Sequence, residues 1–150
     1  MLQLRFDPIQ LADSPHEAYD RVVKLPSSRF SDPELTWTYE VAPGGIDFVS
    51  SKELGKDYKG DLFVGSARGA LRNGNIFRLR IERNRKEVDV DDRRLRDKVA
   101  DNLGKYEITE SESLLFGENF GVTPDVRESP NGTLYVVSNT LGTVFEIARK

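Results

Sequence analysis

The sequence has no cysteine, one histidine and one tryptophan among its 150 residues. The absence of cysteine excludes a disulfide scaffold, a thiolate metal site and a cysteine nucleophile. No stretch approaches the ~18 apolar residues of a membrane-spanning helix, so we expect no membrane partner. The first ten residues, MLQLRFDPIQ, contain an acid and a proline where a signal peptide has its apolar run. We therefore expect no export signal at this end.

An excess of charge of one sign is also missing. The chain has 22 Lys and Arg against 25 Asp and Glu, and its formal net charge is −3, which argues against nucleic acid as a partner. Residues 72–98 hold ten basic side chains interleaved with six acidic ones. Because the two signs alternate, we interpret this segment as a solvated surface with local ion pairs. A phosphate-binding patch is the alternative.

The chain changes character near residue 35. Residues 1–34 carry four of the seven prolines and are predicted to be an extended leader, with a weak helical pattern at 15–24. Residues 35–150 alternate short β-prone runs with turn residues, which is typical of an all-β domain. The predicted strands cover residues 35–41, 45–50, 61–67, 75–82, 112–117, 125–128, 133–138 and 143–149.

One interruption is predicted to be helical, near residues 91–102. Asp91 or Asp92 can cap it, and Leu95 and Val99 lie one turn apart on a single apolar stripe. Gly104 is expected to end this helix. We interpret residues 83–110 as an excursion between two strands.

The strongest organisational signal is an internal repeat. GDLFVGS at 60–66 matches GTLYVVS at 132–138, and GNIFRLR at 74–80 matches GTVFEIA at 142–148. A recurring unit of short strands is typical of propeller blades, which have four antiparallel strands each. We therefore predict about two four-stranded antiparallel blades, the first at about 45–119 and the second at about 124–150.

Two pairs of residues are expected to be equivalent in these blades. Phe77 and Phe145 occupy the same slot, and truncating either one is expected to be severely destabilising. Upstream, IDF at 46–48 is aligned with PDV at 124–126, which makes Asp47 equivalent to Asp125. A repeated aspartate either ties the N–H groups of a loop or faces the central channel.

Taken in order, several segments resemble the C-terminal part of the glucose/sorbosone dehydrogenase family, the propellers similar to soluble quinoprotein aldose sugar dehydrogenases. The matching segments are FSDPELTW (30–37), VAPGGIDF (41–48), YKGDLFVGS (58–66), GNIFRLR (74–80), SLLFGENFG (113–121) and DVRESPNGTLYVVS (125–138). The resemblance implies a six-bladed β-propeller that holds pyrroloquinoline quinone and calcium on its axis. It also implies an exported protein that oxidises the aldehyde or hemiacetal carbon of sugars.

The resemblance places the catalytic histidine and most calcium ligands of the family in earlier blades. We therefore predict no catalytic residue and no metal ligand in this chain. His16 lies outside every matching segment and is interpreted as a surface residue.

Two quinone-binding positions of the family can be compared residue by residue. A family lysine corresponds to Arg68, our one cofactor-binding candidate, which either pairs with a quinone carboxylate or serves as a turn residue. The family's Arg-x-Arg pair corresponds to Val122 and Pro124. Because a tricarboxylate needs cationic partners, this departure argues against cofactor binding. It favours the alternative function, a non-catalytic propeller module that binds carbohydrate or a protein.

The predicted strands also suggest how the chain assembles. The second blade lacks a fourth strand, whereas residues 35–41 form an extra strand ahead of the first blade. The exposed blade faces are expected to meet the remaining blades of a longer chain. The alternative is a cyclic homo-oligomer, a trimer in which each 35–41 strand completes the second blade of a neighbour.

Overall fold

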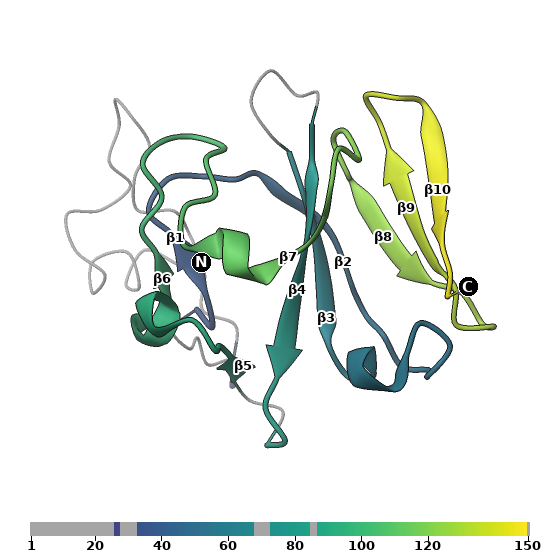
Figure 1. Cartoon of the computed structure of the whole chain (residues 1–150), viewed down its shortest axis with the longest axis horizontal. Helices are drawn as coiled ribbons and strands as arrows, with labels where there is room; N and C mark the ends of the chain where they lie inside the picture. The colour runs from purple at the N-terminus through teal and green to yellow at the C-terminus, as the bar shows by residue number, and fades with distance from the viewer. Residues whose placement is uncertain (1–25, 28–32, 68–72, 85–86, 150) are drawn as a thin grey trace. The chain divides into compact units, whose positions relative to one another are not determined.

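The computed structural model describes residues 26–27, 33–67, 73–84 and 87–149 (Figure 1). The chain divides into two units, Met1–Glu34 and Leu35–Lys150. The strands described below all belong to the second unit. Three sequence predictions concern residues outside the described ones: the helical pattern at 15–24, the surface position of His16 and the candidate Arg68. Most of the predicted leader at 1–34 lies outside them as well.

Short strands dominate this unit, in agreement with the predicted all-β class. They are β1 (Thr36–Trp37), β2 (Pro43–Phe48), β3 (Leu62–Ser66), β4 (Asn75–Ile81), β5 (Val88–Asp89), β6 (Val99–Ala100), β7 (Leu115–Glu118), β8 (Asp125–Glu128), β9 (Leu134–Ser138) and β10 (Thr143–Ile147). In the described residues, short 3-10 helices join them: η1 (Lys56–Tyr58), η3 (Arg93–Asp97) and η4 (Ser111–Leu114). Within the described ranges, no helix is long and apolar enough to cross a membrane.

Two antiparallel sheets form the body of the unit (Figure 1). The first has the order β2-β3-β4, and the outer edge of β4 is shared by β7 and β5. The second has the order β8-β9-β10. Val64 lies opposite Phe77 in the first sheet, and Val136 lies opposite Phe145 in the second. The hairpins β3–β4 and β9–β10 thus pair their matched segments in the same register.

The predicted alignment of β2 with β8, the first strands of the two sheets, which we call the inner strands, is wrong by two residues. Ile46 lies opposite Val64 and Val126 lies opposite Val136, so Ile46 is equivalent to Val126. Asp47 is therefore equivalent to the residue after Val126, Arg127, and not to Asp125. The physical reason is that cross-strand pairing with the middle strand sets the register, and β2 has an irregularity between Pro43 and Ile46.

The main core lies between the facing sides of the two sheets. Phe63 and Ile76 of the first sheet are fully buried in one cluster with Val126, Leu134 and Val136 of the second. This burial of large apolar side chains is the main source of stability for two packed sheets.

The other side of the first sheet is covered as well. Val64, Leu79 and Val88 form a second buried cluster there, and the Trp37 ring centroid lies 5.6 Å from that of Phe77. The first sheet is therefore buried on both faces, as a strand layer between two neighbours must be.

The segment predicted as a helix near 91–102 is much shorter. Asp92 does cap it, since its Oδ1 accepts a hydrogen bond from the Arg94 N–H at 3.0 Å. The 3-10 helix ends at Asp97, because Lys98 adopts a left-handed φ of 66° and Val99 enters β6. Pairing of β6 with β1 outweighs the weak local preference for helix here. Gly104 therefore does not end the helix, contrary to the prediction.

The predicted strand at 35–41 is also wrong in extent. Only Thr36–Trp37 is a strand, and it pairs in parallel with Val99–Ala100 of the same chain. Residues 35–41 are thus no spare strand, and the strand-exchange trimer loses its basis. The predicted strand at 112–117 begins later, at Leu115, because η4 takes up its first residues.

Candidate functional site

Val122 and Pro124, which the resemblance predicts to stand at quinone positions, lie at one end of the two sheets, the upper end in Figure 1. We call this end the rim and define it by residues 42–45, 65–67, 73–75, 120–125 and 138–140. Val122 and Pro124 directly precede β8, and the position of Arg68 follows Ala67 at the end of β3. The described part of the rim therefore contains Val122 and Pro124, whereas Arg68, the predicted quinone contact, lies outside the described residues.

Thr123 anchors the rim between the two sheets. It is 1% exposed, its Oγ1 donates to the Ser66 carbonyl at 3.2 Å, and its own carbonyl accepts from the Gly45 N–H at 3.0 Å. The backbone passes closely here, since a Cβ on Gly74 would lie 1.6 Å from the Gly121 carbonyl oxygen. The rim is thus held by backbone contacts that leave little freedom of position.

Val122 is tethered to the turn after β9. Its N–H donates to Thr140 Oγ1 at 3.2 Å, and its carbonyl accepts from the Asn139 N–H at 2.8 Å. Its side chain is half-buried, whereas Pro124 is exposed. Both positions are therefore at least partly exposed at the rim.

The described rim does not fit a quinone tricarboxylate. Such a group needs cationic partners when it leaves water, and none of the described rim residues is basic. Val122 and Pro124 offer only apolar atoms. The described part of the chain also contains no group of three His, Asp or Glu side chains placed to hold a metal ion. We therefore derive no step through quinone or calcium.

A carboxylate clasp joins β2 to β8 below the rim. Glu128 accepts hydrogen bonds from the Ser50 N–H at 2.8 Å, from the Ser50 hydroxyl and from the Ser51 N–H at 3.0 Å. In return, Asp47 Oδ2 accepts from the Glu128 N–H at 2.8 Å. Sequence reasoning missed this clasp, because Glu128 is 78 residues away from Ser50 and carries no motif.

The clasp changes the pKa of Glu128. Burial alone would raise it, but the hydrogen bonds from Ser50 and Ser51 outweigh burial and lower the pKa from 4.5 to about 2. The clasp therefore strengthens when Glu128 is ionised, and it contributes stability that is present above about pH 4.5 and is lost as the pH falls toward about 2.

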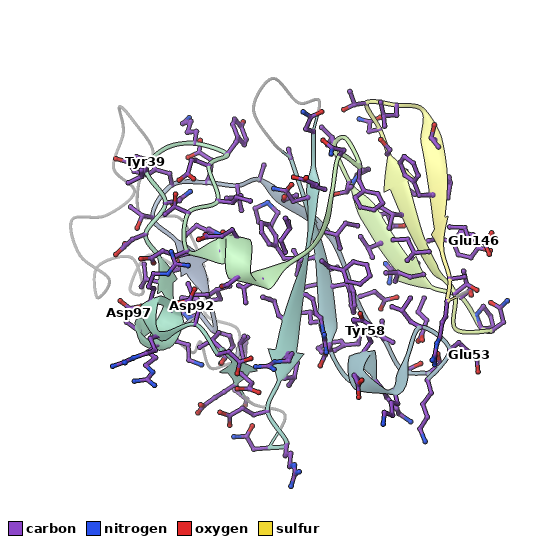
Figure 2. All side chains as sticks on the ribbon, viewed as in Figure 1. Tyr39, Glu53, Tyr58, Asp92, Asp97 and Glu146 are labelled. Carbon is purple, nitrogen blue, oxygen red and sulfur yellow. The ribbon has the colours of Figure 1, made fainter. Side chains whose placement is uncertain are left out.

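We expect the substitution Glu128→Gln to destabilise the protein by about 1–3 kcal/mol at neutral pH, because a charged acceptor of three hydrogen bonds is lost. The deficit should shrink as the pH falls toward about 2, where the wild-type carboxyl becomes protonated. Urea unfolding at several pH values measures this. Glu146→Gln, on an exposed residue of β10 labelled in Figure 2, is the control and should change little. A deficit of Glu128→Gln that stays constant with pH would contradict the clasp.

Fold and rim define the class of protein: an all-β chain with two packed antiparallel sheets whose inner strands meet at a common rim. Its sequence matches the model of the glucose/sorbosone dehydrogenase family over residues 22–146. The chain therefore belongs to this family, and the resemblance found in the sequence is confirmed. Comparison with curated proteins and with solved structures gives no match.

Proposed function

We propose that the chain supplies two adjacent blades of a sugar-dehydrogenase-type β-propeller, a first at about 45–119 and a second at about 124–150, after a leader at 1–34. The observation that carries this proposal is the shared register of the two hairpins, β3–β4 and β9–β10. In a propeller, equivalent strands of successive blades repeat the same pairing, and each blade packs on the next.

The two faces of the sheets support the same arrangement. The register makes Tyr135 equivalent to Phe63 and Val144 equivalent to Ile76. Phe63 and Ile76 are 0% exposed between the sheets, whereas Tyr135 is 36% and Val144 60% exposed. The second sheet thus presents to solvent the positions that the first sheet buries against its neighbour. The occupant proposed for this face is a further blade of the same fold.

The composition of the rim favours a non-catalytic role for this blade pair. The family's activity is quinone-dependent oxidation of aldose sugars, and in this chain apolar Val122 and Pro124 stand at the cationic positions. We propose that the pair shapes the wall of the axial site and binds carbohydrate or a protein partner there, without holding the quinone.

A quinone titration tests this role. Wild-type protein with calcium chloride and pyrroloquinoline quinone is expected to show no saturable binding at micromolar concentrations in fluorescence titrations. The double variant Val122→Arg/Pro124→Arg restores two cations at surface positions of the rim and should bind measurably, because each charge-assisted pair strengthens carboxylate binding.

The matched control is Val122→Gln/Pro124→Gln, which adds length without charge and should bind no better than wild type. Micromolar quinone binding by the wild type, or dye reduction with glucose, would overturn the non-catalytic assignment and return the chain to the redox class.

A further inference from the structure

A groove of about 390 Å³ lies at the end of the first sheet away from the rim. Its walls come from η1, β4, β5, η4 and β7, and residues on opposite walls include Tyr58 and Asp92, both labelled in Figure 2. The volume lies within the ~300–1,000 Å³ of small-molecule sites. No part of the quinone rim contributes to it.

Two arginines in the groove are held in place before any ligand binds. Arg78 Nε donates to Asp61 Oδ2 at 2.6 Å, and its guanidinium lies 4.4 Å from the centroid of the Tyr58 ring. Arg80 Nη2 lies 2.7 Å from Asp91 Oδ1 and 3.5 Å from Asp89 Oδ2. Such pairing restricts the side-chain rotamers, so a ligand meets donors that are already oriented.

The charges of the groove are compensated internally. Arg78 and Arg80 are paired as above, and Asp92 of the wall is paired with Arg94 at 2.6 Å. An anion at Arg80 would lie beside the carboxylates of Asp89 and Asp91, and a cation would lie beside the guanidinium. The groove therefore disfavours ionic ligands of either sign.

A neutral polyol avoids this conflict. One of two adjacent hydroxyls can donate to Asp91 while the other accepts from Arg80, which leaves the ion pair intact. The contacts of Arg80 with Asp89 and Asp91 both use Nη2, and a guanidinium carries further N–H donors at Nε and Nη1. Ser113 adds a hydroxyl to the wall.

The remaining wall is apolar and suits the C–H face of a sugar ring. Leu115 and Phe116 line it, and the Phe116 ring is fixed edge-on against Tyr58 at 5.7 Å and Phe63 at 4.9 Å between centroids. We infer that this groove is a binding site for a neutral saccharide, in which Arg80 and Asp91 bind adjacent hydroxyls. The inference does not depend on the propeller assignment or on the rim.

An NMR titration of the ¹⁵N-labelled chain with maltose tests the inference. Saturable shifts are expected at residues 89–92 and 113–116, and sodium sulfate at matched ionic strength should not reproduce them. Arg80→Gln and Asp91→Asn should each weaken maltose binding about tenfold, as loss of one charge-assisted hydrogen bond does. Both side chains are partly or largely exposed, so the fold should survive these changes.

Arg96→Gln, an exposed arginine outside the groove, is the control and should bind maltose as the wild type does. Absence of saturable shifts with maltose, or shifts confined to residues outside the groove, would overturn the proposal. Equal shifts with sulfate would show an anion site and would overturn it as well. None of these results depends on quinone binding, so failure here is distinguishable from failure of the proposed rim function.

Discussion

Phe77→Ala is expected to destabilise the protein by about 3–5 kcal/mol, the usual cost of removing a buried aromatic ring. Phe77 is 0% exposed, pairs with Val64 on one side and Leu115 on the other, and its ring lies against Trp37. These neighbours belong to three separate elements, β3, β7 and β1, so they cannot all move in to fill the cavity that the substitution leaves. Urea unfolding monitored by circular dichroism measures the loss.

Phe145→Ala is the matched comparison. The repeat places Phe145 and Phe77 at equivalent positions, but the structure buries Phe145 less than Phe77. Phe145 is only half-buried and packs edge-on against Phe120 at 5.2 Å between centroids. We expect a smaller loss, about 1–3 kcal/mol, in proportion to the apolar area that is buried. Equal losses for the two variants would mean that β10 is covered more fully than the structure has it.

Gly45→Ala is expected to have the next largest effect, because this glycine lies where β2 meets β8. A Cβ at this position would lie 2.4 Å from the Asp125 backbone and equally close to the Val126 nitrogen. Backbone atoms cannot rotate away, so the two inner strands must separate. We expect this to destabilise the protein by about 1–3 kcal/mol or more, as overpacking of a core does. Thermal unfolding of the variant measures this cost.

Gly104→Ala is the control for that substitution. Nothing lies within 4 Å of a Cβ at Gly104, and its φ is not in the left-handed range. We expect its stability to stay within about 0.5 kcal/mol of the wild type. If Gly45→Ala also melts like the wild type, β2 and β8 are not in contact and the packing of the two sheets described above is wrong.

The hairpins were predictable from sequence because alternating apolar residues set their register. A slip of one residue would turn Val136 and Phe145 away from the core. The strand at 125–128 was predicted with its observed bounds. The predicted equivalence of Asp47 and Asp125 was wrong. It relied on an alignment of three residues, which carries no information on strand pairing next to the irregularity in β2.

Tertiary contacts decided the features that sequence reasoning missed. The helix expected near 91–102 gave way to strand pairing between β1 and β6, a partner that lies far away along the chain. The clasp of Glu128 and the groove around Arg80 both depend on residues from separate elements. For the rim, the family motif predicts that Val122 and Pro124 stand at quinone positions, and this assignment stays a prediction.

We propose that the two sheets are neighbouring blades, which requires that they pack through one shared core. Nuclear Overhauser effects in protein with labelled methyl groups and labelled phenylalanine rings measure this directly. We expect cross-peaks that connect Phe63 and Ile76 of the first sheet with Val126, Leu134 and Val136 of the second, since all five belong to one buried cluster. Cross-peaks within each sheet, with none between the sheets, would contradict the claim.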